Sequence, residues 1–187
     1  MESDFFVAKD GHFTLDPGAY FGITPRNVWS RAFKENNEHR VTLRANVPVI
    51  EDDGKIYILD SGIGKEPEEN IRKWFQCTKD SDLLEEIRKR GIEKVDGIFQ
   101  SHLHFDHMGH SFRDFPGATI YVSNTEIGNM KNPDELSRGS YVKWDESFSG
   151  TKIRPLFGNI QVGNFNIVRS SGHTTGHQII FVEKGST

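Results

Sequence analysis

The chain has 187 residues, a length typical of one globular domain that buries a core without disulfide bonds, and its single cysteine excludes an internal disulfide. Hydrophobic residues make up 35% of the sequence and charged residues 27%, with no apolar run long enough to cross a bilayer. The net charge of −4 provides no basic stripe for a phosphate backbone. We therefore expect one domain over residues 1–187, no nucleic acid or membrane partner and, because the amino terminus is acidic and lacks signal-peptide features, a cytoplasmic location.

The first clear elements form a hairpin. Alternating apolar residues predict a half-buried strand over 41–49, and Pro48 within it suggests an edge or a strand end. The pair Asp53-Gly54 is typical of a tight turn, so residues 55–59 are predicted to return as the second strand. This strand leads directly into Asp60, which is therefore expected in a loop at a strand end.

A helix and a buried strand follow. Asp82 is a favourable N-cap and Gly91 a favourable C-cap, which together predict a helix from about 82 to 90. The apolar run within 95–100 indicates a short buried strand. That strand delivers the chain to His102, so the histidine-rich segment is expected at a strand end.

Later elements continue the mixed pattern. The predicted elements are a strand at 118–122, a helix at 124–130, strands at 160–162 and 165–168, and a last strand at 178–183. Residues 135–150 match no single pattern. Strand hairpins followed by alternating strands and helices indicate a mixed α/β or α+β sandwich with helices outside the sheets.

The segment SHLHFDHMGH, residues 101–110, contains four of the eight histidines. His102 and His104 are two apart, so on an extended backbone both imidazoles project to the same side. Asp106 and His107 are adjacent, so the chain must turn near Phe105 if all four side chains are to converge. Imidazole and carboxylate ligands together suit zinc, iron, manganese or cobalt.

A second histidine segment lies near the end of the chain. His173 and His177 occur in SSGHTTGH, where Gly172 and Gly176 permit a tight loop. Six of the eight histidines thus fall in two short segments at strand ends. The alternative, a set of unrelated surface and core histidines, does not account for metal-ligand spacing in both segments, so we predict a metal site.

Three segments resemble the signatures of one family. Residues 102–107 match the HxHxDH signature of the metallo-β-lactamase superfamily, and Gly172–His177 looks like its downstream GHTxGH segment. Leu59–Gly62 is similar to the LVDTG loop of the family, and the three segments occur in the family order. Together with Phe21–Pro25 and Trp29, they make the chain most similar to the branch of acyl-homoserine lactonases.

The resemblance implies a role for each matching residue. The ligands it implies are His102, His104 and His173 for a first metal ion and Asp106 and His107 for a second. Asp106 would also orient or transfer a proton. Asp60 and His177 would support the ligand histidines, although Asp60 as a loop aspartate bonded to its own backbone stays an alternative. Zinc is the expected metal, as one or two ions, with iron or manganese as alternatives, and we expect His110 to lie outside the site.

The family pattern is incomplete in this sequence. Members with two metals use a bridging aspartate and a last histidine beyond the GHTxGH segment, and neither follows His177 here. The implied fold is an αββα sandwich whose second half is incomplete, in a single domain that lacks its C-terminal part. We expect a shortened chain; a natural one-metal form and completion by another polypeptide are the alternatives.

The resemblance also implies a reaction. Metal-activated hydroxide would attack the carbonyl carbon of a small-molecule substrate, a lactone, ester or thioester. Phosphodiester hydrolysis uses the same parts and is one alternative; a non-catalytic or inactive truncated metal-binding domain is the other. Aromatic residues near the amino terminus would form either an apolar lid over the substrate or part of the core. The oligomeric state stays open, with a homodimer among the options.

Overall fold

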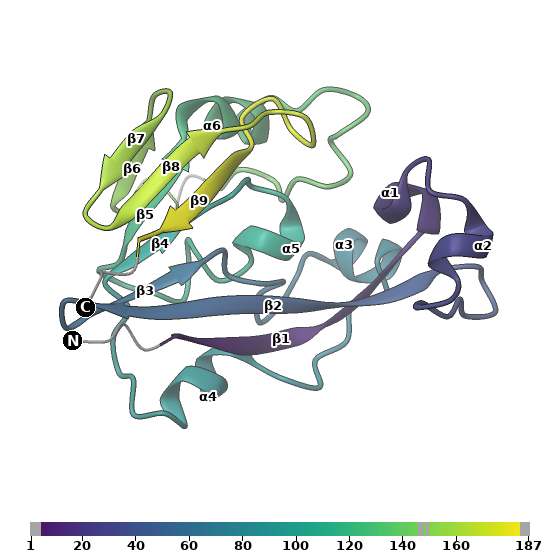
Figure 1. Ribbon diagram of the computed structural model, residues 1–187, viewed down its shortest axis with the longest axis horizontal. Coiled ribbons are helices and arrows are strands. Elements are labelled where there is room, and N and C mark those ends of the chain that lie inside the picture. Colours follow the sequence, from purple (N-terminus) through teal and green to yellow (C-terminus); the bar gives the residue numbers. More distant parts are fainter. Residues whose placement is uncertain (1–4, 146–147, 149, 184–187) are drawn as a thin grey trace.

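Two sheets organise the computed structural model, which describes residues 5–145, 148 and 150–183 (Figure 1). The larger sheet has the order β1 (Phe5–Leu15), β2 (Val41–Asp52), β3 (Lys55–Leu59), β4 (Gly97–Phe99), β5 (Thr119–Ser123) and β6 (Ile153–Leu156). The smaller sheet has the order β7 (Ile160–Val162), β8 (Phe165–Arg169) and β9 (Gln178–Val182). Strands β1 to β3 pair antiparallel, β3 to β6 pair parallel, and the smaller sheet is antiparallel.

Alternation along the central strands produces a core on each face of the larger sheet. Ile98 of β4 and Ile120 of β5 join a large cluster with the helices. Phe99 points to the other face, where it stacks on Tyr121 and on Phe165 of β8. Because successive side chains of a strand face opposite ways, each short apolar strand serves both cores. The middle residues of these strands are therefore apolar on both faces.

The helices lie at one end and on one face of the larger sheet. They are α1 (Pro17–Phe21), α2 (Arg26–Trp29), α3 (Glu69–Trp74), α4 (Leu83–Arg88), α5 (Phe105–Met108) and α6 (Asn124–Lys131). Helices α3 to α6 contribute Ile71, Leu83, Phe105 and Met130 to the large cluster, and no described helical residue joins the cluster between the sheets. None of these helices is long and apolar enough to span a membrane within the described chain.

Most predicted elements are confirmed; the differences are the place of Pro48 in the sheet and several short elements that were not predicted. Asp53 and Gly54 have φ values of 51° and 69°, as a tight hairpin turn requires, and Asp82 caps α4 through Leu84 and Glu85. Strand β2 is interior rather than an edge and continues past Pro48, but pairing with β3 begins only at residue 49. The proline therefore lies where one side of β2 is unpaired, which accommodates its missing N–H.

The sequence did not predict four short helices and two strands; one of these helices, α5, lies where only a turn was expected. The helices α1, α2 and α3 have four to six residues, too few for a helical period. Strand β1 contains charged residues and a bulge between Lys9 and His12, which interrupts its alternation. Strand β6 contains Pro155 in a run of only four residues. The described part of segment 135–150 forms turns and irregular chain with an isolated bridge at Tyr141, and Phe148 and Gly150 have 3₁₀ geometry; residues 146, 147 and 149 lie outside the described chain.

Candidate metal centre

The two histidine segments meet at the carboxyl ends of the central strands. Parallel strands β3 and β4 end side by side, so Asp60 and Ser101 emerge at the same sheet edge. The chain then turns where expected, because α5 begins at Phe105. The loop between β8 and β9 reaches the same edge, where the amide of Gln178 donates a 3.0 Å bond to the carbonyl of Ser101. Three separate loops therefore build one site.

Three imidazoles face one another in this site. One ring nitrogen each of His102, His104 and His173 lies within 4.8 Å of the other two. Nε2 of His173 and Nδ1 of His104 are 3.1 Å apart. Two nitrogens that bind one tetrahedral zinc ion at 2.0–2.1 Å lie about 3.3 Å apart, so this spacing is close to that of two ligands of a single ion.

A hydrogen-bond chain orients His102. The Asp60 carboxylate accepts bonds from the Ser101 amide at 2.7 Å and from the Ser101 hydroxyl at 2.8 Å, and the same hydroxyl lies 2.9 Å from Nδ1 of His102. Because the hydroxyl proton is directed to Asp60, the hydroxyl oxygen accepts from Nδ1–H. Nε2 of His102 then carries the lone pair, and this buried atom has no hydrogen-bond partner in the described structure.

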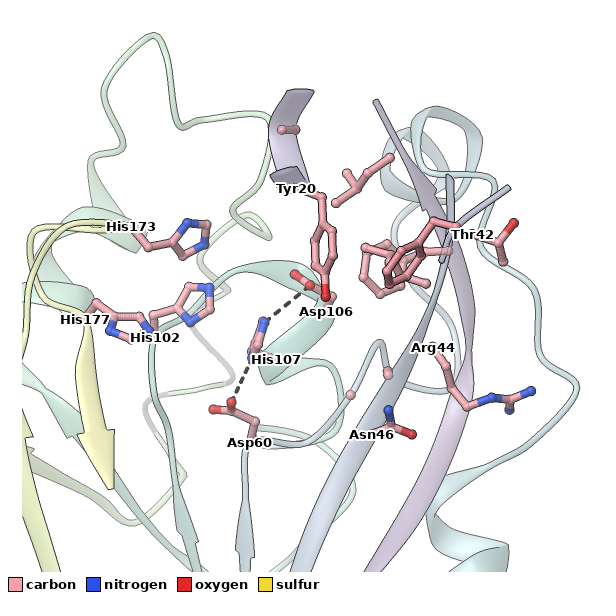
Figure 2. Close-up of a pocket in the computed structure, with 17 residues that line it drawn as sticks. Tyr20, Thr42, Arg44, Asn46, Asp60, His102, Asp106, His107, His173 and His177 are labelled. Carbon is pink, nitrogen blue, oxygen red and sulfur yellow. Dashed lines mark hydrogen bonds and ion pairs between the residues drawn. The ribbon is translucent and has the colours of Figure 1, made fainter. Parts of the chain in front are cut away.

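Asp60 also holds His107. Nδ1 of His107 lies 2.7 Å from the Asp60 carboxylate, and Nε2 of the same ring lies 3.3 Å from the Asp106 carboxylate; Figure 2 marks both contacts. Asp60 has a φ of 58°, a conformation that aspartate tolerates better than most residues. One carboxylate thus orients both His102, through Ser101, and His107 directly.

The pKa values follow from burial and neighbouring charge. Burial and the surrounding histidines strongly lower the pKa of His102 and lower the pKa of His104 to about 4, so both rings are neutral near pH 7. Burial opposes a charge on His107, but Asp60 and Asp106 outweigh it and raise its pKa. Burial likewise opposes ionisation of Asp106, but His107 outweighs it and lowers the pKa of that carboxyl. The neutral rings of His102 and His104 and the ionised Asp106 carboxylate fit a transition-metal ion, whereas His107 would have to lose its proton to bind one.

A cavity of about 670 Å³ opens beside these residues. Asp60, His102, Asp106, His107, His173 and His177 line one side, and Tyr20, Phe33, Thr42, Leu43 and Asn46 are among the residues of the other. Figure 2 shows Tyr20 pointing from α1 towards Asp106 and His107. A cavity of this size fits a small molecule.

The aromatic residues near the amino terminus pack mainly on one another. Phe21 stacks on Trp29 with ring centroids 4.8 Å apart and contacts Phe33 at 5.0 Å. Tyr20 and Phe33 also line the cavity, whereas Trp29 is buried. These residues belong to neither main core cluster, so they form a separate group beside the cavity.

His177 lies behind the three facing imidazoles. Its Nδ1 is 2.7 Å from the hydroxyl of Ser170, and its ring lies 5.4 Å from that of His102. Burial and the neighbouring His173 lower the pKa of His177. The structure therefore places His177 at the site without including it in the group of three.

His110 belongs to a different cluster. It is fully buried, with Nε2 3.1 Å from Asp10 and Nδ1 2.7 Å from Asp114. The Asp10 carboxylate also accepts bonds from the amides of Ile63 and Gly64. His110 thus lies outside the group of three, as expected, and its contact with Asp10 joins the turn after α5 to β1.

Two contributors to the site were missed in the sequence. Ser101 is the relay between Asp60 and His102, and Glu126 in α6 is a fully buried carboxylate between the two histidine segments. A serine before HxH and a glutamate in the first turn of a helix are both common, and no spacing links Glu126 to the histidines. Only the folded chain brings it to them.

Comparison with known proteins places these observations in a family. A model of the metallo-beta-lactamase superfamily matches residues 41–185. N-acyl homoserine lactonase AttM of Rhizobium radiobacter is 31% identical over 118 residues, which cover 58% of this chain and 44% of the relative. A probable metallo-hydrolase of Methanocaldococcus jannaschii is 26% identical over 112 residues, or 54% of this chain and 51% of the relative. The chain spans about half the length of these curated relatives.

Solved structures share the fold. A probable metal-dependent hydrolase from Staphylococcus aureus superposes with a TM-score of 0.86 at 24% identity, over 98% of this chain and 69% of that chain. AidC, a dizinc quorum-quenching lactonase in complex with a product, superposes with a TM-score of 0.73 at 20% identity, over 98% and 68% of the two chains. At these identities the likeness concerns the fold alone.

Proposed function

The chain belongs to the metallo-beta-lactamase superfamily, and we propose that it is a metal-dependent hydrolase that acts on the carbonyl of a small lactone, ester or thioester. The observation that carries the proposal is the group of three imidazoles, in which the lone pair of His102 Nε2 is buried and unused. Leaving such an atom without a partner is costly, and a bound ion removes that cost.

The proposal assigns metal-binding roles to five side chains. His102, His104 and His173 hold one ion, and Asp106 and His107 contribute to a second. Zinc is the preferred metal because neutral imidazole and carboxylate suit it, with iron or manganese as alternatives. Asp60 fixes the ring orientation of His102 and His107, and a carboxylate behind a ligand imidazole also raises its basicity.

The chemistry divides between the metal and the chain. Bound zinc supplies Lewis acidity and lowers the pKa of a water molecule it binds to about 7. Asp106 borders the cavity. Burial opposes ionisation of its carboxyl, but His107 outweighs burial and lowers the pKa, so the ionised carboxylate can accept a proton. The proton would come from the attacking water, and Asp106 would pass it to the leaving oxygen of a lactone or ester, or to the leaving sulfur of a thioester, as the bond to the carbonyl carbon breaks.

The substrate class rests on the cavity and the relatives. The cavity is lined on one side by aromatic and aliphatic side chains, including Tyr20, Phe33 and Leu43, which suits a small molecule with an apolar part. Several relatives are named N-acyl homoserine lactonases, which supports a carbonyl substrate. A phosphodiester is the alternative within the same fold, because the same ligands serve both reactions.

One observation favours a non-catalytic alternative. Among the described residues, the groups of three or more metal-ligating side chains within 4.8 Å are His102, His104 and His173, and Asp10, Asp82 and His110. Asp106 and His107 belong to neither group. A chain that holds one ion for structural purposes is consistent with this arrangement.

Metal analysis and a hydrolysis screen test the proposal. Protein purified without chelator should contain at least one transition-metal ion per chain and should hydrolyse an acyl-homoserine lactone, a nitrophenyl ester or an acyl thioester faster than bis(p-nitrophenyl) phosphate. His104→Ala should abolish turnover, whereas substitution of the exposed His39 should not. Metal-replete wild-type protein without turnover would favour the structural alternative, and absence of metal would refute the proposal.

A further inference from the structure

Glu126 occupies an unusual place in the fold. Its side chain is fully buried in the first turn of α6, where a carboxylate is costly unless it is well hydrogen-bonded. We infer that Glu126 is a positioning residue of the metal site, a carboxylate clamp that fixes the segment of His102 and His104 against the segment of His173 and His177. The expected effect of Glu126 on metal affinity rests on the proposed function, whereas its hydrogen bonds to the two segments do not.

The clamp binds one backbone amide from each histidine segment. Oε2 of Glu126 accepts a 3.1 Å bond from the amide of Leu103, which lies between His102 and His104. Oε1 accepts a 3.1 Å bond from the amide of Gly176, next to His177. The two amides are 73 positions apart in the sequence, and both bonds are buried. The carboxylate therefore sets the distance between the segments on which the three facing imidazoles lie.

Two side-chain donors complete the coordination of the carboxylate. Asn129 donates to Oε1 at 2.9 Å and Tyr141 donates to Oε2 at 3.1 Å. The ring of Tyr141 also packs against His104 with centroids 4.7 Å apart. Glu126 thus accepts four bonds and holds a side chain that contacts a candidate ligand directly.

An uncharged amide cannot replace this carboxylate. A glutamine in the same position has one oxygen and one NH₂ group, so one side of the side chain loses its acceptor. In one orientation the NH₂ group faces the amide of Leu103, and in the other it faces the amide of Gly176. Each orientation leaves one histidine segment without its bond, whereas the shape of the side chain is kept.

The close packing at Gly176 supports the same role. A Cβ at this position would lie 2.7 Å from Oε1 and 2.8 Å from the backbone nitrogen of Glu126. The absence of a side chain therefore permits the direct contact between the loop and α6. Besides the clamp, the bond from the Gln178 amide to the Ser101 carbonyl joins the two segments, so loss of the clamp should loosen the site without unfolding the sheet.

The test compares Glu126→Gln with Met130→Val. Met130 lies on the same helix, is buried in the large core and makes none of the clamp contacts. Met130→Val therefore controls for a general loss of stability that leaves the clamp intact. We expect Glu126→Gln to weaken binding of Co²⁺ at least tenfold in a chelator competition and to change the visible spectrum of the bound ion. Met130→Val should keep Co²⁺ affinity within twofold and keep the spectrum. Partners behind metal ligands typically change affinity by about 10- to 100-fold.

Amide hydrogen exchange of the metal-free proteins gives an independent measurement. Glu126→Gln should accelerate exchange in residues 101–105 and 172–178 together, and Met130→Val should not do so selectively. Wild-type protein that binds no Co²⁺ or Zn²⁺ would refute the proposed function, while the exchange data would still decide on the clamp. Unchanged Co²⁺ affinity in Glu126→Gln, or unchanged exchange in either segment, would overturn the inference.

A second variant covers the case in which Glu126→Gln does not fold. Gly176→Ala keeps the carboxylate but forces the loop away from α6, so it should also weaken Co²⁺ binding and accelerate exchange in residues 172–178. Wild-type affinity and exchange in this variant would contradict the clamp.

Discussion

Asp60 and Ser101, which follow neighbouring parallel strands, are joined by two hydrogen bonds, from the amide and from the hydroxyl of the serine to the two carboxylate oxygens. The serine hydroxyl extends the contact to His102, and the second oxygen of Asp60 also contacts His107. Two strand ends are thereby held together at the point where the candidate ligand histidines begin. The orientation of two imidazoles depends on this one pair.

Replacement of Asp60 by asparagine should weaken zinc binding by about 10- to 100-fold, because an amide lacks the second acceptor that His107 and Ser101 share. Asp53→Asn is the matched control: Asp53 also has a left-handed backbone, with φ 51° against 58° for Asp60, but it lies in the β2–β3 turn. Chelator competition on both purified variants measures the difference. Equal affinities would show that Asp60 only shapes its own loop.

The two histidines of the last loop should separate in function. His173 belongs to the group of three imidazoles, so His173→Ala should remove a metal ion and reduce turnover by several orders of magnitude. His177→Ala should keep the metal content, because His177 is bonded to Ser170 outside that group. Metal content by mass spectrometry decides the assignment, and loss of metal in both variants would place His177 among the ligands.

The His110 cluster should make stability depend on pH. Burial opposes a charge on His110, but hydrogen bonds and charges from Asp10 and Asp114 outweigh it and raise its pKa, while Lys79 and Asp82 also face Asp10. A raised pKa in the folded state stabilises the fold below the ordinary value near 6.5, and this contribution is lost as pH rises through the folded pKa. The free energy of unfolding of chelator-treated protein, measured in urea, should therefore decline as the pH rises above 6.5.

A His110→Asn variant provides the comparison. It should be less stable than wild type at pH 6, and the difference in unfolding free energy should narrow as the pH rises towards 9. Parallel stability curves for the two proteins would mean that His110 does not change its charge in this range.

Gly109 should not tolerate a side chain. A Cβ there would lie 2.1 Å from the nitrogen of Gly64 and 2.1 Å from the carbonyl carbon of Ile63, at the close contact between α5 and the loop after β3. Gly109→Ala should cost about 1–3 kcal/mol or more, as overpacking does. Gly128→Ala, in α6 with open space around it, should instead stabilise by up to about 1 kcal/mol. Urea denaturation measures the change in unfolding free energy of each variant, which should be a loss for Gly109→Ala and a gain for Gly128→Ala.

The sequence predicted the elements whose patterns are local. The hairpin at Asp53-Gly54, the capped helix after Asp82 and the short apolar strands 97–99 and 165–169 all rely on neighbours within a few residues. The same applies to the turn at Phe105, which the adjacency of Asp106 and His107 required. Strand β1 was missed because its bulge and charged residues hide the alternation, and its pairing with β2 is decided by contacts far along the chain.

Histidine spacing by itself was enough to predict a metal site from two segments of this chain, because the residue types and the intervals of two and four positions are properties of the sequence alone. The tertiary structure decided which carboxylates serve those segments. Asp60 meets Ser101 because two parallel strands end at one edge, and Glu126 meets Leu103 and Gly176 because α6 packs between loops 73 positions apart. A buried carboxylate is recognised by the donors around it, and those donors come together only when the chain folds.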